Sequence, residues 1–388
     1  MRFAPDDPPA PQVGRRLRLR VGVSHAMRFV RHRLRHLSGI ALTLIMQPRS
    51  DGTLLQPRDV QSVLICRING RVGNTLFLTP LIRRIHELLP HAAIDLALAY
   101  PQAEELLAEF PGLRSVILFP HGSSRKLWRY LLALRRLRAC QYDLAIDPVR
   151  ESMSGRIAVS ICRAQHRLGY ASKSQWAPLT HAVIPLPGLQ HHAIEPVFLL
   201  SRVFGVHCES RNIRISLPVR DDELLTGRRI VTEAIARVHP QATAAQAFGF
   251  FSHAAGLKSQ GRNWWLAFWE AFLALEPEAV PVECLPSYHQ APVDARFPSF
   301  HVPSARLASA AIAATRMFVS SDTGPLHLAS ATNVPTVGLF RASAPELYGP
   351  LKPTDLAIDT TLYSPAAVAR RCQQLWRMRT ASLPVCES

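Results

Sequence analysis

The sequence lacks the long hydrophobic run that a membrane-spanning helix needs. Of its 388 residues 48% are hydrophobic, yet no uninterrupted apolar stretch approaches the roughly 18–20 residues that cross a bilayer, so we expect a soluble body. Cysteine is also scarce: the seven cysteines are scattered and form no Cys-x-x-Cys pair. This argues against a disulfide framework or a zinc knuckle and favours a reducing compartment such as the cytosol.

Acidic side chains are few compared with basic ones. Lys and Arg number 45 against 28 Asp and Glu, which gives a formal net charge of +17. Residues 1–58 alone hold eleven arginines and three acidic residues. So basic a surface suits an anionic partner, namely nucleic acid, an acidic membrane face or a phosphorylated substrate.

The N-terminal 58 residues differ in composition and in hydrophobic pattern from the rest of the chain. Residues 1–13 are rich in proline, and between Val23 and Ile45 the apolar residues recur at helical spacing with arginines and histidines opposite. This pattern predicts a basic amphipathic helix on an anionic membrane surface. Two alternatives stay open: a helix docked on the body, or a weakly ordered extension. A signal peptide fits poorly, because no small-x-small cleavage site follows the short apolar stretch.

After residue 58 short apolar runs alternate with helical patterns, which predicts an α/β fold with doubly wound parallel sheets. We expect strands at 62–67, 93–99, 115–119, 142–147, 247–253, 280–285, 317–320 and 335–340, and helices at 75–89, 102–110, 125–140, 263–275, 304–315, 322–332 and 364–379. The expected organisation is an extension (1–58), a first domain (59–205), a linker with edge elements (206–245), a second domain (246–360) and a closing helix with a tail (361–388).

The stretch Val319–Ala329 carries the strongest candidate site. A hydrophobic strand ends in the turn Asp322-Thr323-Gly324-Pro325, and a helix containing His327 follows. Free N–H groups at the start of that helix, the Thr323 hydroxyl and His327 can together bind an anion. The alternative is a helix that is simply capped by Asp322.

Two glycine-bearing loops supply further candidates. The loop in Ser252–Trp265 carries Lys258 and Arg262, two cations that suit a diphosphate leaving group, although a solvated basic loop is the alternative. The loop in Arg67–Pro80 contains Gly73, Asn74 and Thr75, and it matches neither the dinucleotide fingerprint nor a Walker A sequence. We interpret it as a loop at the carboxyl end of a strand that comes close to the second half of the molecule.

Asp147 stands at the carboxyl end of its predicted strand, where it is a candidate proton acceptor or, alternatively, the cap of the next helix. His191 and His192 lie near Glu195 without a third ligand at metal spacing, and we interpret them as a surface pair. We therefore predict no metal site.

Taken in order, these stretches resemble glycosyltransferase family nine, the lipopolysaccharide heptosyltransferases. The matching positions are Arg67, Gly73, Asn74, Thr79, Pro80, Lys258, Trp264, Asp322, Thr323, Gly324, His327, Ala329, Gly349 and Pro350. The resemblance runs from about residue 60 to residue 350, and the element 322–329 is its most specific part.

The resemblance implies a GT-B fold, in which two Rossmann-like domains face a cleft, and a metal-independent, inverting transfer from a nucleotide sugar, typically ADP-heptose. It implies that Lys258, His327 and the N–H groups near Thr323 stabilise the departing diphosphate, and it suggests Glu283 for the ribose hydroxyls. No Asp-x-Asp run is present to bridge a metal and the diphosphate. The expected acceptor is a lipid-linked anionic glycan at the cytoplasmic face of the bacterial inner membrane, to which the enzyme binds peripherally.

One position departs from the family pattern. Many members carry Asp directly after the loop glycine as the general base, whereas this chain has Asn74, whose amide cannot take a proton at neutral pH. Either another base such as Asp147 serves, or the acceptor differs, or activity is lost. The competing hypotheses are a non-catalytic nucleotide-sugar-binding protein and a nucleic-acid-binding protein; the second is disfavoured because no recognised binding motif is present.

Overall fold

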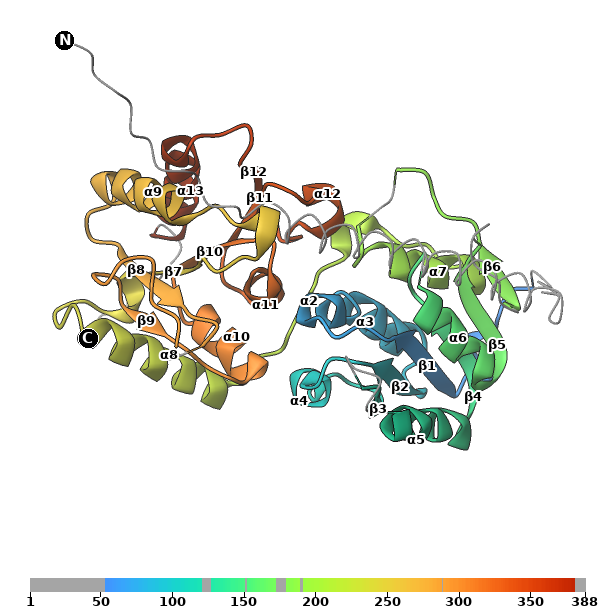
Figure 1. Cartoon of the computed structure of the whole chain (residues 1–388). Helices are drawn as coiled ribbons and strands as arrows, with labels where there is room; N and C mark the ends of the chain where they lie inside the picture. Colours follow the sequence, from blue (N-terminus) through green and yellow to red (C-terminus); the bar gives the residue numbers. More distant parts are fainter. Residues whose placement is uncertain are drawn as a thin grey trace, which may run out of the picture.

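The chain forms two α/β halves that lie side by side (Figure 1). The computed structural model describes residues 53–120, 127–150, 152–171, 179–188, 191–287 and 289–380. The amphipathic segment predicted between residues 23 and 45 lies outside the described residues, as does the tail after residue 380. Among the helices that are described, none has the length and hydropathy needed to cross a membrane.

The first half is built on a six-stranded parallel sheet. Its strands are β1 (Ser62–Arg67), β2 (Ala93–Leu98), β3 (Leu113–Leu118), β4 (Gln141–Asp147), β5 (Arg163–Tyr170) and β6 (His181–Val183), in the order β3-β2-β1-β4-β5-β6. Its helices are α2 (Val72–Leu76), α3 (Thr79–Leu88), α4 (Ala103–Leu107), α5 (Leu127–Ala139), α6 (Met153–Ile161) and α7 (Glu195–Phe204). The central strand β1 is almost entirely buried, as expected for a parallel sheet covered on both faces.

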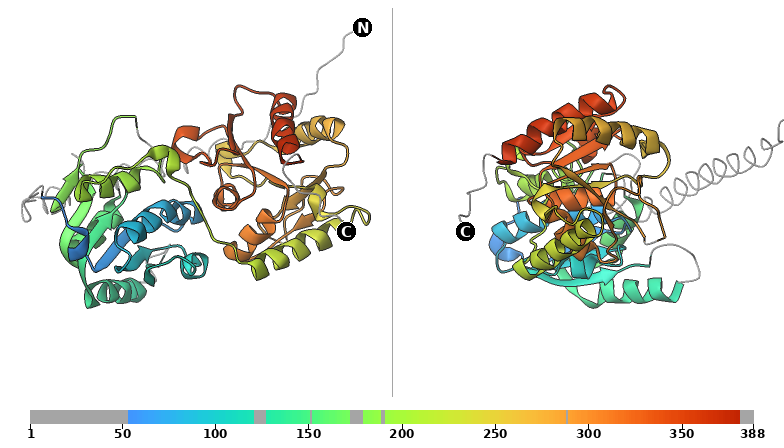
Figure 2. Two further views of the ribbon diagram at one scale, coloured as in Figure 1. Left: turned by 180° about the vertical axis from the view of Figure 1, so that it is seen from behind. Right: turned by 90° about the vertical axis from the view of Figure 1, so that its left-hand side faces the viewer.

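The second half repeats this plan. Its strands are β7 (Ala247–Phe251), β8 (Val280–Cys284), β9 (Ser299–Phe300), β10 (Met317–Ser321), β11 (Thr336–Phe340) and β12 (Leu356–Asp359), all parallel, in the order β9-β8-β7-β10-β11-β12. Its helices are α8 (Asp221–Ala236), α9 (Arg262–Leu275), α10 (Ala305–Ala313), α11 (Gly324–Ala331), α12 (Pro345–Tyr348) and α13 (Pro365–Thr380). Helices α9 and α13 cover one face of the sheet, and α8 and α10 cover the other (Figures 1 and 2).

Both sheets therefore have the strand order 3-2-1-4-5-6 of a Rossmann fold, counted within each half. The direction of winding reverses between β1 and β4 in the first half and between β7 and β10 in the second. Ligands of doubly wound sheets bind outside the carboxyl ends of the strands at this reversal. The predicted α/β fold class is confirmed, and the topology marks the place where a ligand belongs.

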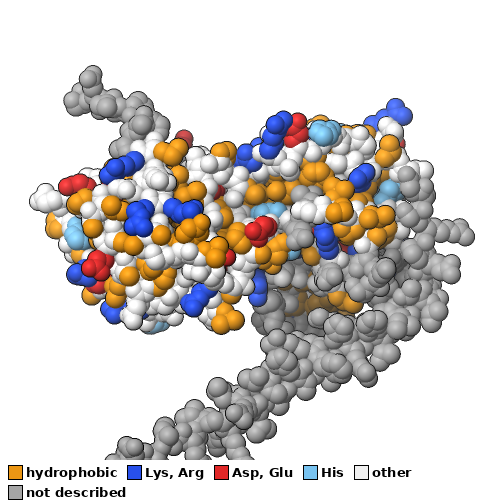
Figure 3. All heavy atoms as spheres, turned by 90° about the horizontal axis from the view of Figure 1, so that it is seen from above, with side chains coloured by type: hydrophobic (Ala, Val, Ile, Leu, Met, Phe, Trp, Pro, Cys, Tyr) orange, Lys and Arg blue, Asp and Glu red, His pale blue; other side chains and the backbone are white. Residues whose placement is uncertain are grey.

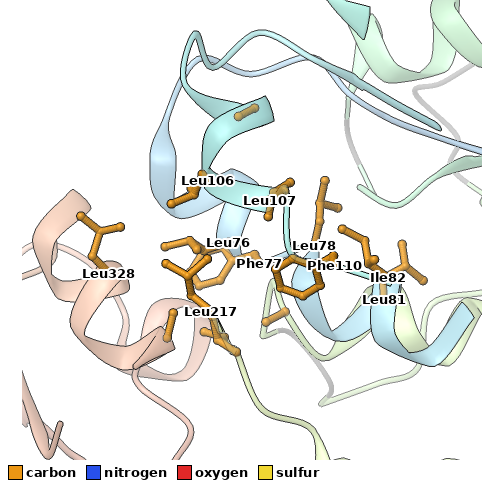
Figure 4. Close-up of a cluster of buried hydrophobic side chains, with 14 of the residues drawn as sticks. Leu76, Phe77, Leu78, Leu81, Ile82, Leu106, Leu107, Phe110, Leu217 and Leu328 are labelled. Carbon is orange, nitrogen blue, oxygen red and sulfur yellow. The ribbon is translucent and has the colours of Figure 1, made fainter. Parts of the chain in front are cut away.

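A shared hydrophobic cluster joins the two halves. Leu76 and Phe77 lie beside Leu328 of α11 and Leu217 of the connecting segment, and all four side chains are buried (Figure 4). Gly73 in α2 leaves no room for a side chain, because a Cβ there would lie 2.3 Å from Cδ2 of His327. The starts of α2 and α11 are therefore packed directly on each other.

The structure contains elements that the sequence interpretation did not list, namely α6, β5, β6, α7, β9, α12 and β12, and it differs from that interpretation at two further places. The single helix predicted at 75–89 is two helices, α2 and α3, because Pro80 fits the first turn of a helix and not its interior. The segment interpreted as linker and edge elements contains the 16-residue helix α8. Gly227 lets α8 approach α10 closely, since a Cβ at this glycine would lie 2.4 Å from the carbonyl oxygen of Ala310.

Candidate active site

A cavity of about 1050 Å³ opens between the two halves. Its walls come from the loops that follow β1, β4, β7 and β10, at the winding reversals of both sheets. The residues that line it include Arg67, Asn74, His192, Lys258, Asp322 and His327. The cavity thus combines the first-half loop and the second-half turn that the sequence singled out separately.

On the second-half wall Asp322 organises two potential donors. Its carboxylate forms an ion pair with Lys258 and lies 3.2 Å from Nε2 of His327. Burial raises the pKa of Asp322, but hydrogen bonds from His327 and Lys258 outweigh it and hold that pKa well below its usual range. The carboxylate therefore stays ionised and fixes the directions of Lys258 and His327.

Helix α11 starts at this wall. Its N-cap is Thr323, in extended conformation and without a side-chain capping bond, and Gly324 and Pro325 begin the helix. The alternative interpretation of Asp322 as the cap is therefore wrong, because its carboxylate is engaged by Lys258 and His327. The first N–H groups of a helix have no acceptor within the helix and carry a positive potential, which suits an anion.

The first-half wall holds a buried cation and a neutral amide. Arg67, the last residue of β1, donates from Nη2 to Oδ1 of Asn74 over 3.0 Å. Burial lowers the pKa of Arg67 to about 10, so its guanidinium is still charged at neutral pH. At the position where the family pattern has a carboxylate, the structure therefore places an uncharged group beside a charged arginine.

His192 also lines the cavity, and the sequence analysis missed it. Its ring centroid lies 4.8 Å from that of Tyr348 and 6.3 Å from that of Phe77. Burial, with the positive charge of Arg67 as the next contribution, lowers the pKa of His192 to about 4, so the imidazole is neutral at pH 7. Among the described residues no hydrogen bond to its ring nitrogens is found.

The interpretation of His191 and His192 as a surface pair is wrong. His191 is buried, and its Nε2 lies 2.9 Å from the carbonyl oxygen of Gly349, while the backbone N–H of His192 donates to the carbonyl of Leu347 over 3.1 Å. These two histidines thus attach the start of α7 to α12 of the other half. Nothing in the sequence signalled this contact, because His191 and Gly349 are 158 positions apart in the chain.

Asp147 does not line the cavity. Its side chain is fully buried, and Oδ2 lies 2.9 Å from Nε of Arg156. Burial raises the pKa of Asp147 to about 6, although Arg156 opposes the shift. The cap of α6 is Ser152, whose hydroxyl accepts from the N–H of Gly155 over 3.0 Å, so the alternative role of Asp147 as a cap is also wrong.

Three other candidates lie away from the cavity walls. Glu283 is fully buried, accepts hydrogen bonds from Ser252 and from the N–H of Val293, and has its pKa raised by burial. Arg262 is exposed and donates to the carbonyl oxygen of Val293 over 2.9 Å. The two residues thus hold the segment that follows β8. Thr75 is buried in α2.

Within the described part of the chain, no group of three or more His, Cys, Asp or Glu side chains is placed to hold a metal ion. Cationic groups line the cavity instead: Arg67 and Arg71 from the first half and Lys258 from the second.

Comparison with known proteins agrees with this geometry. The family model of glycosyltransferase family 9 (heptosyltransferase) matches residues 304–375, which include the turn at Asp322 and helix α11. The resemblance to glycosyltransferase family 9 is confirmed. A search of curated proteins gives no significant match.

Solved structures of this family have the same fold. The glycosyltransferase family 9 protein of Veillonella parvula DSM 2008 is 14% identical, with a TM-score of 0.67 over 83% of this chain and 99% of that chain. Heptosyltransferase WaaC of E. coli with ADP is 15% identical, with a TM-score of 0.62 over 81% of this chain and 99% of that chain. ADP-heptose lipopolysaccharide heptosyltransferase II of E. coli is 16% identical, with a TM-score of 0.63 over 82% and 99%. The fold is therefore GT-B, and the comparisons support a glycosyltransferase.

Proposed function

We propose that the protein is a metal-independent, inverting glycosyltransferase that moves a sugar from an ADP-linked donor to a lipopolysaccharide-type or related surface glycan. Heptose is the sugar favoured by the resemblance and by the names of the similar structures. The observation that carries the proposal is the arrangement of Lys258, Asp322 and His327 beside the start of α11, at the winding reversal of the second sheet.

The second-half wall suits a departing nucleoside diphosphate. In one displacement the acceptor oxygen attacks the anomeric carbon, the bond from that carbon to the diphosphate breaks, and the electron pair leaves with the nucleotide. Lys258, His327 and the start of α11 line the cavity together, and their N–H groups are the donors that we assign to the oxygen on which this negative charge develops. Fixed donors of this kind are worth about 10²–10³-fold in rate each. They supply the positive potential that a divalent cation supplies in other transferases.

The acceptor must also lose a proton. Asn74 cannot take it, and Asp147 would first have to leave its buried ion pair with Arg156. His192 lines the same wall as Asn74 and is neutral at pH 7. We therefore propose His192 as the proton acceptor, with Asp147 as the other candidate; a bound diphosphate adds negative charge to the cavity and raises the basicity of the imidazole.

A lipid-linked acceptor, an anionic membrane surface and a cytoplasmic, peripheral location are parts of the same proposal. The net charge of +17 supports an anionic partner. Over the face seen in Figure 3, basic side chains are dispersed rather than gathered in one strip. This face therefore carries no basic strip of the kind that would favour nucleic-acid binding.

Calorimetric titration of the full chain with ADP tests the donor assignment, with GDP and UDP as controls and with magnesium present or absent. We expect selective ADP binding that does not need magnesium. A preference for UDP or GDP would exclude an ADP-sugar donor. ADP binding without release of ADP from ADP-heptose on any lipopolysaccharide acceptor would instead support the non-catalytic hypothesis.

A further inference from the structure

Helix α5 of the first half presents large apolar side chains to solvent. Trp128 is 62% exposed, Leu131 53% and Leu132 43%, all within one and a half turns of the same helix. On the opposite face Ala133 and Leu137 are buried against the sheet. The helix is therefore anchored on one side and apolar on the other, whereas single exposed apolar residues are normal on a protein surface.

The exposed side of α5 is also strongly basic. Arg129, Arg135, Arg136 and Arg138 are exposed, and the helix contains no acidic residue. The guanidinium of Arg129 lies 5.2 Å from the ring centroid of Trp128. A helix face that combines tryptophan and leucines with several arginines is typical of segments that lie in the interface of an anionic bilayer.

The place of α5 connects this face to the cavity. The helix lies along the outer edge of the first half, at the bottom of Figure 1 and on the same edge in both views of Figure 2. Tyr130, from the same helix, lines the cavity. Tyr130 lies on the buried side of α5, where its ring packs against Phe119, so α5 stands between its exposed face and the first-half wall of the cavity.

We propose that the exposed face of α5, formed by Trp128, Leu131, Leu132 and the four arginines, docks on the surface of an anionic lipid bilayer. The leucines and the tryptophan enter the interface, and the arginines contact lipid phosphates. This surface belongs to the described body and is separate from the amphipathic segment predicted between residues 23 and 45. Docking itself does not depend on the proposed sugar transfer; only its use, the presentation of a lipid-linked acceptor, rests on that proposal.

Co-sedimentation of the full chain with vesicles tests the surface, using phosphatidylcholine vesicles with and without phosphatidylglycerol. We expect binding to the anionic vesicles that weakens with salt. The triple change Trp128→Ser, Leu131→Ser and Leu132→Ser, and separately the pair Arg135→Gln and Arg136→Gln, should each weaken binding about tenfold or more. A matched comparison is Leu131→Ser with Arg135→Gln on α5 against Leu225→Ser with Arg229→Gln on α8, since each pair removes one exposed leucine and one exposed arginine charge at the same spacing, and only the α5 pair should weaken binding.

The proposal is overturned if the wild-type protein does not bind anionic vesicles, or if the α5 variants bind them as well as the wild type does. It is also overturned if the control pair on α8 loses as much binding as the α5 variants. Binding that is abolished by deleting residues 1–52 and unaffected by the α5 changes would assign membrane contact to the N-terminal segment alone. Each variant is first checked for an unchanged melting temperature and unchanged ADP titration. A failure of ADP binding in the wild type would contradict the proposed function and leave the vesicle result valid.

Discussion

The two walls of the cavity differ in how their charges are arranged. On the second-half wall one ionised carboxylate, Asp322, is shared by Lys258 and His327, and this wall lies largely in the region that the family model matches. On the first-half wall Arg67 contacts the neutral Asn74, with His192 nearby. On the proposed function, the wall assigned to the leaving group keeps the residues of the family pattern, while the wall assigned to the acceptor lacks the family carboxylate.

The sharpest test of this contrast is His192→Phe, which keeps an aromatic ring against Tyr348 and removes the proton acceptor. We expect the transfer rate to fall by about 10²–10⁴-fold, with ADP affinity unchanged. Adding Asn74→Asp to this variant should restore part of the rate, because it returns a carboxylate to the family position. Full activity of His192→Phe in a steady-state assay of ADP release would show that the imidazole takes no proton.

On the other wall, Lys258→Ala should slow transfer by about 10²–10³-fold, because it removes a donor to the departing diphosphate. The side chain is 38% exposed, so the melting temperature should hardly change. Arg262→Ala is the comparison, a second cation on the same loop that is held by Val293 outside the cavity. Equal losses in the two variants would mean that Arg262 also reaches the donor.

The Asp147→Asn variant separates the two candidate bases. If His192 is the base, this variant still transfers sugar and stays folded, because the amide oxygen can still accept the hydrogen bond from Nε of Arg156 and the fold already favours the uncharged form of this side chain. Loss of transfer at a temperature where the variant is fully folded by circular dichroism would make Asp147 the base.

The same variant should alter how stability depends on pH. Burial raises the pKa of Asp147 from 3.8 to about 6, so in this interval the folded protein holds a proton that the unfolded chain releases. The contribution of this carboxyl to stability is present below the lower value and is lost as the pH rises through the higher one. Denaturant unfolding at several pH values should show a flatter dependence in the variant.

The smallest expected effect is on the pH dependence of kcat/KM. Because the pKa of His192 is lowered to about 4 before any donor binds, kcat/KM for the nucleotide sugar, which reports the free enzyme, should change little between pH 7 and pH 5.5 and should fall only at lower pH. A profile that already falls near pH 6.5, the value of an ordinary histidine, would contradict the assignment. The His192→Phe variant is the control, since its residual activity should lack this acidic limb.

Much of the fold could be predicted from the sequence, because the relevant patterns are local. The strands at 62–67, 93–98 and 317–321 follow from short apolar runs bounded by turn residues. Helix α8 was missed, although its apolar positions recur at helical spacing, because the surrounding segment is rich in charge.

The predicted site residues divide into those that reach the cavity and those that do not. The turn 322–325 and Lys258 reach the cavity, because a strand end and the helix start after it fix where such residues point. Asp147 and Glu283 also stand at strand ends but are buried, since Arg156 covers the first, and Ser252 and Val293 cover the second. Nothing within a few residues of either carboxylate distinguishes an open strand end from a covered one.

The alternating strands and helices, the excess of basic residues and the helix-starting turn at Asp322 could be predicted from the sequence, because each depends on neighbours along the chain. Three features become visible only in the tertiary structure: His192 lines the cavity, Asp147 is buried against Arg156 of α6, and one face of α5 is exposed. These properties depend on packing between distant segments, such as His192 against Leu347 and Tyr348. The spacing of residues along a single sequence does not reveal contacts between segments that are far apart in the chain.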